Sequence, residues 1–184
     1  MARERKEPQG LVIVNTGNGK GKTTAALGLV LRAAGNGLRV YIIQFIKGRW
    51  KTGESKSLAA LAPNVEVVRM GTGFTIERLR DPRIPMEDHH EAARLAFQRA
   101  REVVASGEYD MVVLDEILGS IKADLVTLDD VMTLVREKPP ALHLVLTGRG
   151  APDELIDAAD LVTEMRLVKH PYERGIKAQR GIEF

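Results

Sequence analysis

The sequence predicts an α/β protein whose mostly parallel β-sheet is covered by helices on both faces. Predicted strands alternate with predicted helices along the chain, and the strands are short continuous apolar runs. Half-exposed strands would instead alternate apolar and polar residues. Continuous runs therefore indicate strands buried on both faces, as in parallel sheets whose strands are joined by crossover helices.

The first half of the chain contains three predicted strands. The run GLVIVNT at 10–16 is apolar and β-branched, and it leads into a glycine-rich loop. Apolar residues then recur at helical spacing until Gly35-Asn36-Gly37 ends the helix. Two more strands, a polar loop and a short helix follow: strands at 39–45 and 65–71, the loop at 46–56 and the helix at 57–62.

The second half begins with the longest irregular segment, 72–88, which contains Pro82 and Pro85. Residues 86–107 form the clearest amphipathic helix, with one apolar stripe of alanine, phenylalanine and valine. The remaining predicted elements are a strand at 109–116, two short helices, a strand at 141–149, a helix at 152–160, a strand at 161–170 and a polar tail. The second short helix opens at Thr127 with Asp130 three residues on, which resembles a capping box.

Composition and charge exclude several classes of protein. The 184 residues contain no cysteine, which excludes disulfides, cysteine-ligated zinc and a cysteine nucleophile, and which fits a cytoplasmic protein. The formal net charge is only +2 and no basic stripe is visible, so we expect no nucleic-acid partner. The chain has no apolar run of about 18 residues, so we expect no membrane segment. We expect a flexible arm at 1–9 and a single domain at 10–184.

The loop after the first strand carries a phosphate-binding motif with one departure. Residues 15–24 read NTGNGKGKTT, which fits G-x-x-x-x-G-K-[ST] at Gly21-Lys22-Thr23 but has Thr16 where the pattern has glycine. Backbone N–H groups of such a loop, and the helix that begins near Lys22, attract phosphate oxygens. Lys22 would add a positive charge, and the Thr23 hydroxyl would face Mg²⁺. The fold class is therefore P-loop NTPase-like (RecA-like).

The predicted strand at 109–116 ends in two carboxylates, in the sequence VVLDE at 112–116. Ligands of parallel sheets bind beyond the carboxyl ends of the strands, so Asp115 and Glu116 are expected beside the phosphate loop. A carboxylate there would hold the metal ion directly or through water. No asparagine is followed by lysine, so the base-reading N-K-x-D segment of GTPases is absent. These residues leave open a nucleotide-dependent enzyme such as a small-molecule kinase, or a nucleotide-gated binding module.

Several segments together resemble the P-loop ATP:corrinoid adenosyltransferases, which act on cob(I)yrinic acid a,c-diamide and cob(I)alamin. The segments are TGNGKGKTTAALG, QFIKG, GTGFT, YDMVVLDE, LTGRG, AADLVTEM and VKHPYERGIKAQRGIEF. The resemblance runs from about residue 11 to the C-terminus, and it includes the threonine before GNGKGKTT. It implies transfer of the 5′-deoxyadenosyl group from ATP to Co(I) of a corrinoid, with release of triphosphate.

The resemblance also assigns roles to residues. It implies that Gly17, Asn18, Gly19, Lys20, Gly21, Lys22, Thr23 and Thr24 bind the triphosphate, and that Arg32 contacts a phosphate. Thr23, Glu116 and Asp115 match the metal-binding positions, and Lys22 and Glu116 are expected to act in catalysis. Phe74 matches an aromatic residue that displaces the lower axial ligand of the corrinoid. Where some members have tryptophan two residues later, this chain has Ile76. A homodimer and an electron-donating reductase or flavoprotein are the expected partners.

Overall fold

The computed structural model describes residues 9–46, 48, 52–73 and 81–183. Its centre is a sheet of six strands in the order β3-β2-β4-β5-β1-β6, and every neighbouring pair is parallel. The strands are β1 Val12–Thr16, β2 Val40–Gln44, β3 Val65–Arg69, β4 Met111–Asp115, β5 His143–Thr147 and β6 Leu161–Glu164. The predicted fold class is thus confirmed, and the described sheet is parallel throughout.

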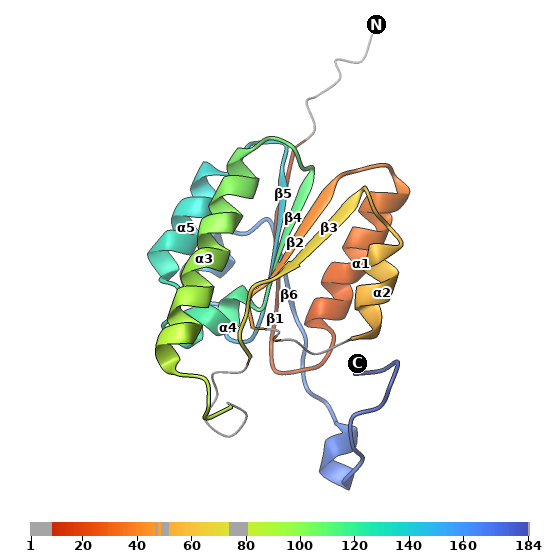
Figure 1. Cartoon of the computed structure of the whole chain (residues 1–184). Coiled ribbons are helices and arrows are strands. Elements are labelled where there is room, and N and C mark those ends of the chain that lie inside the picture. Colours follow the sequence, from red (N-terminus) through yellow and green to blue (C-terminus); the bar gives the residue numbers. More distant parts are fainter. Residues whose placement is uncertain (1–8, 47, 49–51, 74–80, 184) are drawn as a thin grey trace, which may run out of the picture.

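Helices cover both faces of the sheet (Figure 1). Helices α1 and α2 lie on one face, and α3, α4 and α5 lie on the other. The helices are α1 Lys22–Gly35, α2 Gly53–Ala59, α3 Met86–Ala105, α4 Ile117–Lys122, α5 Leu128–Glu137 and α6 Asp153–Ala158, with a 3-10 helix at Pro171–Arg174. No helix in the described part of the chain is both long enough and apolar enough to span a membrane.

The two faces of the sheet form two hydrophobic cores, because successive side chains of a strand point in opposite directions. Along β1, Val12 and Val14 pack in the core beneath α3, α4 and α5, whereas Ile13 packs in the core beneath α1. The same alternation divides β2, where Ile42 and Ile43 are both fully buried but belong to different cores. The apolar runs of the sequence therefore serve two cores at once.

Most predicted elements are present, with different ends. The predicted loop at 46–56 is wrong in its last part, since α2 begins at Gly53; only Leu58 of that helix is buried, so its apolar signal is weak. The last predicted strand ends at Glu164 instead of residue 170, because the next backbone groups bond to the phosphate loop. The cap of α5 is confirmed, since the Thr127 side chain accepts a hydrogen bond from the Asp130 backbone N–H.

Candidate active site

The glycine-rich loop between β1 and α1 lies against the backbone that follows β6. The Gly19 N–H donates a hydrogen bond to the Met165 carbonyl, with N and O 2.6 Å apart. A β-carbon at Gly17 or Gly19 would approach that same carbonyl oxygen to 2.5 or 2.6 Å. Gly17 and Gly21 also have positive φ values, 97° and 123°, which L side chains rarely adopt. The loop therefore needs glycine for contact at two positions and for backbone conformation at two.

Gly19→Ala is expected to lower the free energy of unfolding by about 1–3 kcal/mol, because the new methyl group cannot share space with the Met165 backbone. For a chain of this size, each 1 kcal/mol corresponds to a melting temperature about 2–4 °C lower. The control is Gly28→Ala, in the middle of α1, where an added β-carbon meets nothing within 4 Å. That change should raise stability by up to about 1 kcal/mol. Equal melting temperatures for the two variants would contradict the packing.

Thr16, the departure from the phosphate-loop pattern, is the last residue of β1 and is buried. Its hydroxyl accepts a hydrogen bond from the Ala151 N–H at 3.1 Å, and its carbonyl accepts one from the Met165 N–H at 2.8 Å. Extended backbone at this position needs no glycine, because the first positive φ value falls one residue later, at Gly17. Thr16 thus ties the start of the loop to two neighbouring segments.

Lys22 extends back into the loop that precedes it. Its buried ammonium group donates hydrogen bonds to the carbonyls of Gly17, at 2.8 Å, and Gly19, at 2.7 Å. Burial lowers the pKa of Lys22 below its ordinary value; the negative charge of Glu116 opposes this shift, and the positive charge of Arg149 adds to it. The loop thus holds a partly desolvated cation at its centre, which is suited to binding an anion.

Asp115 joins the carboxyl ends of three strands to the amino end of α1. Its Oδ1 accepts hydrogen bonds from the hydroxyls of Thr23, at 2.8 Å, and Thr147, at 2.9 Å. Its Oδ2 accepts one from the Gln44 amide at 3.2 Å. Strand β5 separates β4 from β1, yet this network brings Asp115 to the first turn of α1. The expected proximity of Asp115 to the phosphate loop is therefore confirmed.

Glu116 is held beside Lys22 and Thr23 by an uncommon backbone conformation. Its φ of 64° and ψ of 23° lie in the left-handed region, immediately before α4. Its backbone N–H donates to the Thr147 hydroxyl at 2.9 Å. Non-glycine residues in this region carry strain and are concentrated at functional sites. The conformation turns the chain sharply at the strand end and leaves Glu116 lining the same hollow as Lys22 and Thr23.

The donor set beside the loop fits a magnesium ion. Thr23 donates its hydroxyl proton to Asp115, so its remaining lone pairs can face a cation. Glu116 adds a carboxylate, and hard oxygen ligands of this kind are those that Mg²⁺ prefers. Asp115 accepts its hydrogen bonds through both carboxylate oxygens, which suits a role in holding Thr23. Within the described residues no cluster of three acidic or histidine side chains provides a complete metal site.

The hollow at this site has a volume of about 480 Å³. Its lining comprises the loop residues Lys20, Gly21, Lys22, Thr23 and Thr24, Leu27 of α1, Gly53 and Glu54 of α2, Glu116, and the C-terminal residues Gly181, Ile182 and Glu183. The site thus lies beyond the carboxyl ends of the strands, where the blue C-terminal segment returns beneath α1 and α2 (Figure 1).

The other predicted site residues lie in different places. Asn18 is exposed in the loop. Arg32 is exposed in the last turn of α1, about 15 Å along the helix axis from Lys22, and it does not line the hollow. Its contact with a phosphate stays a prediction. Phe74 and Ile76 lie outside the described residues, so their roles stay predictions too.

Sequence reasoning missed several residues of the site. Gln44 and Thr147 end β2 and β5, so the rule that strand ends converge could have found them. Arg149 acts on Lys22 through its charge and follows β5 in the segment LTGRG. No local signal identifies the α2 residues Gly53 and Glu54. The C-terminal residues belong to the family-like segment VKHPYERGIKAQRGIEF, but only folding shows that they reach the loop.

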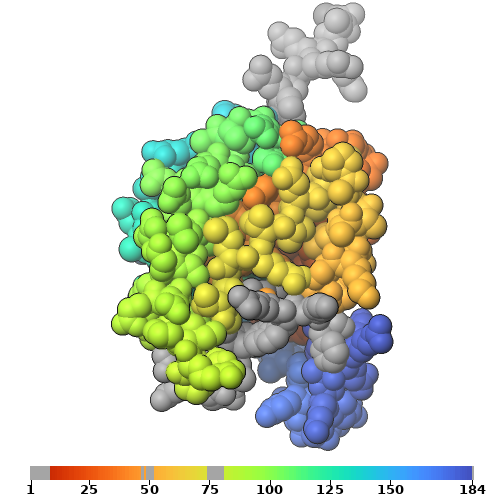
Figure 2. Space-filling view, viewed as in Figure 1, coloured from red at the N-terminus to blue at the C-terminus, as the bar shows by residue number. Residues whose placement is uncertain are grey.

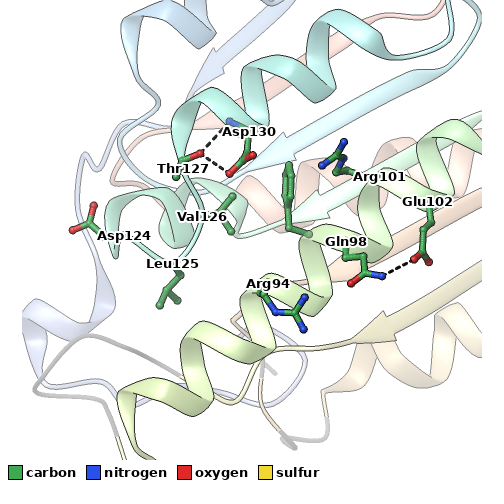
Figure 3. Close-up of a pocket in the computed structure, with 10 residues that line it drawn as sticks. Arg94, Gln98, Arg101, Glu102, Asp124, Leu125, Val126, Thr127 and Asp130 are labelled. Carbon is green, nitrogen blue, oxygen red and sulfur yellow. Dashed lines mark hydrogen bonds between the residues drawn. The ribbon is translucent and has the colours of Figure 1, made fainter.

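A second hollow, of about 540 Å³, lies between α3 and the start of α5, on the face of the sheet that these helices cover (Figure 3). Phe97, Leu125 and Val126 are its apolar residues, and Arg94 and Arg101 are among its charged ones. It contains no residue of the phosphate loop. The smaller hollow therefore carries the chemistry that the sequence predicts.

Solved structures share this fold at low sequence identity. The flagellar accessory protein FlaH from Methanocaldococcus jannaschii has a TM-score of 0.56 at 14% identity, over 88% of this chain and 73% of that one. The KaiC-like protein PH0186 from Pyrococcus horikoshii OT3 has a TM-score of 0.51 at 15% identity, over 91% and 77%. At this level of identity the likeness concerns the fold alone, and it confirms the predicted RecA-like class.

Sequence comparison identifies closer relatives. The chain is 41% identical over 185 residues to a corrinoid adenosyltransferase of Sinorhizobium sp., covering 98% of this chain and 83% of that protein. It is 39% identical over 181 residues to the corrinoid adenosyltransferase of Escherichia coli (strain K12), covering 98% and 89%. Residues 8–184 match the family described as ATP:corrinoid adenosyltransferase BtuR/CobO/CobP. The chain therefore belongs to the ATP:corrinoid adenosyltransferase family.

Proposed function

We propose that this enzyme transfers the 5′-deoxyadenosyl group of ATP to Co(I) of a corrinoid and releases inorganic triphosphate, as a step in adenosylcobalamin formation. Family membership establishes the coarser activity, transfer of the adenosyl group from ATP to a corrinoid. The observation that carries the finer proposal is the convergence of Lys22, Thr23 and Glu116 in one hollow at the end of the sheet. That hollow provides charge and hydrogen bonds for a whole triphosphate.

The reaction needs no nucleophile from the protein. Co(I) attacks the ribose C5′ with an electron pair, a Co–C bond forms, and the C5′–O bond breaks. The triphosphate leaves with the electrons of that bond, and cobalt becomes formally Co(III). The protein must hold C5′ in line with cobalt and stabilise the charge that develops on the leaving oxygen.

The described residues can meet the second of these requirements. The Lys22 ammonium and the loop N–H groups hold the triphosphate, and Thr23 and Glu116 would hold Mg²⁺. When bound, Mg²⁺ neutralises part of the phosphate charge. Asp115 positions Thr23, and Thr147 joins Asp115 to the backbone of Glu116. These side chains therefore favour departure of the triphosphate as a unit.

Product analysis tests this function. ATP and chemically reduced corrinoid should yield adenosylated corrinoid and inorganic triphosphate in equal amounts. ADP and orthophosphate with unchanged corrinoid would refute the proposal. Transfer of the γ-phosphate to a hydroxyl acceptor would favour the kinase alternative.

The affinity for ATP is expected to fall with rising pH earlier than an ordinary lysine would allow. The lowered pKa of Lys22 means that the free enzyme loses this positive charge at a pH below the ordinary lysine value, and neutral Lys22 binds triphosphate weakly. Affinity is full below the pKa of Lys22 and declines as the pH rises through it. Equilibrium titration of ATP from about pH 7 to about pH 10, which spans the range below the ordinary lysine pKa, measures the decline.

Lys22→Arg is the control for this profile. Its guanidinium keeps its charge throughout that pH range, so the alkaline decline should disappear even if absolute affinity changes. An identical decline in both proteins would assign it to another group.

Phe74→Ala is expected to slow adenosylation that starts from Co(II) corrinoid more than adenosylation that starts from preformed Co(I). The reason is the role proposed for Phe74 by family resemblance, displacement of the lower axial ligand, which makes Co(II) easier to reduce. The measurement compares the two initial rates in the variant and the parent. Equal losses in both assays would remove this role.

We also propose that residues 10–184 form a single domain, preceded by a flexible arm at 1–9. We further propose that the enzyme is a cytoplasmic homodimer and that its partner is an electron-donating reductase or flavoprotein. These proposals rest on the sequence and on the family resemblance.

A further inference from the structure

The C-terminal segment closes one side of the hollow that contains the phosphate loop. Gly181, Ile182 and Glu183 line that hollow together with Lys20, Lys22 and Leu27, although about 160 residues separate the two groups in the sequence. Figure 2 shows this blue segment as a projection on the side of the molecule below α2. It belongs to VKHPYERGIKAQRGIEF, a motif that the mechanism above does not use.

Hydrogen bonds anchor the chain just before this segment and shape the segment's end. Before it, the Met165 N–H and carbonyl bond to Thr16 and Gly19 on either side of the loop entry. At its end, Gln179 and Glu183 form a closed turn. The Glu183 N–H donates to the Gln179 carbonyl at 2.9 Å, and the Gln179 N–H donates to Glu183 Oε2 at 2.7 Å. The turn therefore presents Ile182 and Glu183 as a defined surface.

The charged residues that line the hollow come from different segments of the chain. Lys20 and Lys22 belong to the phosphate loop, whose amides and cations attract the phosphates, and Glu116 acts on Lys22 through its charge. Glu54 and Glu183, on α2 and the C-terminal turn, repel phosphates, and carboxylates accept hydrogen bonds without donating any. Their natural partners in a nucleotide are the donors of the nucleoside, which are the exocyclic amine of the base and the ribose hydroxyls.

The lining of the hollow also offers apolar surface for the face of a base. The Ile182 side chain is 63% exposed, and Leu27 of α1, which also lines the hollow, is partly exposed. An isoleucine that is mostly exposed near a polar loop gains from covering an aromatic ring, because both surfaces leave water. The successive residues Ile182 and Glu183 thus provide an apolar surface and a hydrogen-bond acceptor side by side in the sequence.

We propose that the turn Gln179–Glu183 is the nucleoside-binding side of the ATP site. Ile182 packs against the adenine base, and Glu183 accepts a hydrogen bond from a nucleoside donor, either the exocyclic amine or a ribose hydroxyl. The C-terminal turn thereby orients the nucleotide with its triphosphate toward Lys22. This inference deepens the proposed function and rests on it for the identity of the nucleotide.

Glu183→Gln, assayed by equilibrium binding of Mg-nucleotide without corrinoid, tests the acceptor. Three analogues each lack one donor of ATP: inosine triphosphate lacks the amine, and 2′-deoxy-ATP and 3′-deoxy-ATP each lack one hydroxyl. The parent enzyme should bind ATP about tenfold more tightly than the analogue that lacks the donor bound by Glu183, and the variant should lose most of that preference. The analogue whose penalty disappears in Glu183→Gln identifies the donor. An ATP affinity within twofold of the parent and unchanged preferences would overturn the proposal.

Ile182→Ala tests the apolar contact. It should weaken binding of ATP and of all three analogues by the same factor, about fivefold, because the base face is common to them. Matched controls come from the same segment: Ile176→Ala and Glu173→Gln change residues of the same types that do not line the hollow. Both controls should bind ATP like the parent. If Ile182→Ala also did so, the packing role would be refuted.

The adenosylation assay separates this inference from the proposed function. Nucleotide preferences that depend on Glu183, without formation of adenosylated corrinoid, would refute the function and support the inference. Normal adenosylation with parental ATP affinity in both Glu183→Gln and Ile182→Ala would support the function and refute the inference.

Discussion

Lys22→Ala is expected to lower kcat/KM for ATP by about 100- to 1,000-fold, the range typical of removing one group that stabilises a developing anion. In the structure the Lys22 ammonium group lies inside the loop, within hydrogen-bonding distance of the Gly17 and Gly19 carbonyls. Burial makes its charge more effective than a solvated one, because fewer water molecules screen it. Adenosylation with preformed Co(I) corrinoid measures the loss without involving the reductant.

The comparison with two other lysines makes this test specific. Lys20 also lines the hollow but is exposed, so Lys20→Ala should cost less than Lys22→Ala. Lys122, at the end of α4, is exposed and does not line the hollow, so its replacement should leave kcat/KM unchanged. Melting curves would confirm that each variant is folded. A Lys22→Ala enzyme with a kcat/KM close to that of the parent would refute the phosphate-loop assignment.

The sequence predicts the sheet well because its signal is physical and local. Within β4, residues 112–114 are apolar throughout, and the structure buries all three, with alternate side chains in different cores. The start of α2 at Gly53 has no such signal, because its first turn is polar and exposed or half-buried. Helices that bury one residue are hard to recognise from periodicity.

The residues of the active site likewise divide into those that the sequence identifies and those that it does not. The loop, Asp115 and Glu116 are identified by motifs, since phosphate binding requires a specific local order of glycine, lysine and hydroxyl side chains. Gln44 and Thr147 lie in the family-like segments QFIKG and LTGRG, but those segments do not assign them a role; that role depends on hydrogen bonds to Asp115, 71 and 32 residues away in the sequence. Arg32 is assigned to the site from family resemblance alone. That resemblance does not reveal that its side chain is exposed at the far end of α1.

Glu116→Gln is expected to reduce adenosylation by about 10- to 100-fold at low Mg²⁺ concentration, and higher Mg²⁺ should restore part of the activity. The substitution keeps the size of the side chain but removes the negative charge that a divalent ion requires. Losses of this size are typical even for residues that only support metal ligands. The measurement is the initial rate as a function of Mg²⁺ concentration at fixed ATP. A parental Mg²⁺ dependence would show that Glu116 does not hold the ion.

The left-handed backbone at Glu116 predicts that one substitution there will lower activity and raise stability at the same time. Glu116→Gly should abolish most activity yet raise the free energy of unfolding by about 1 kcal/mol, because glycine adopts positive φ without strain. Asp124, at φ 55°, is the matched control: it is the other described non-glycine residue with positive φ, and it lies outside the active-site hollow. Asp124→Gly should gain similar stability and keep parental activity. If both variants gain stability and only Glu116→Gly loses activity, the strained carboxylate is kept for function. If both variants keep parental activity, the strained conformation serves the turn alone.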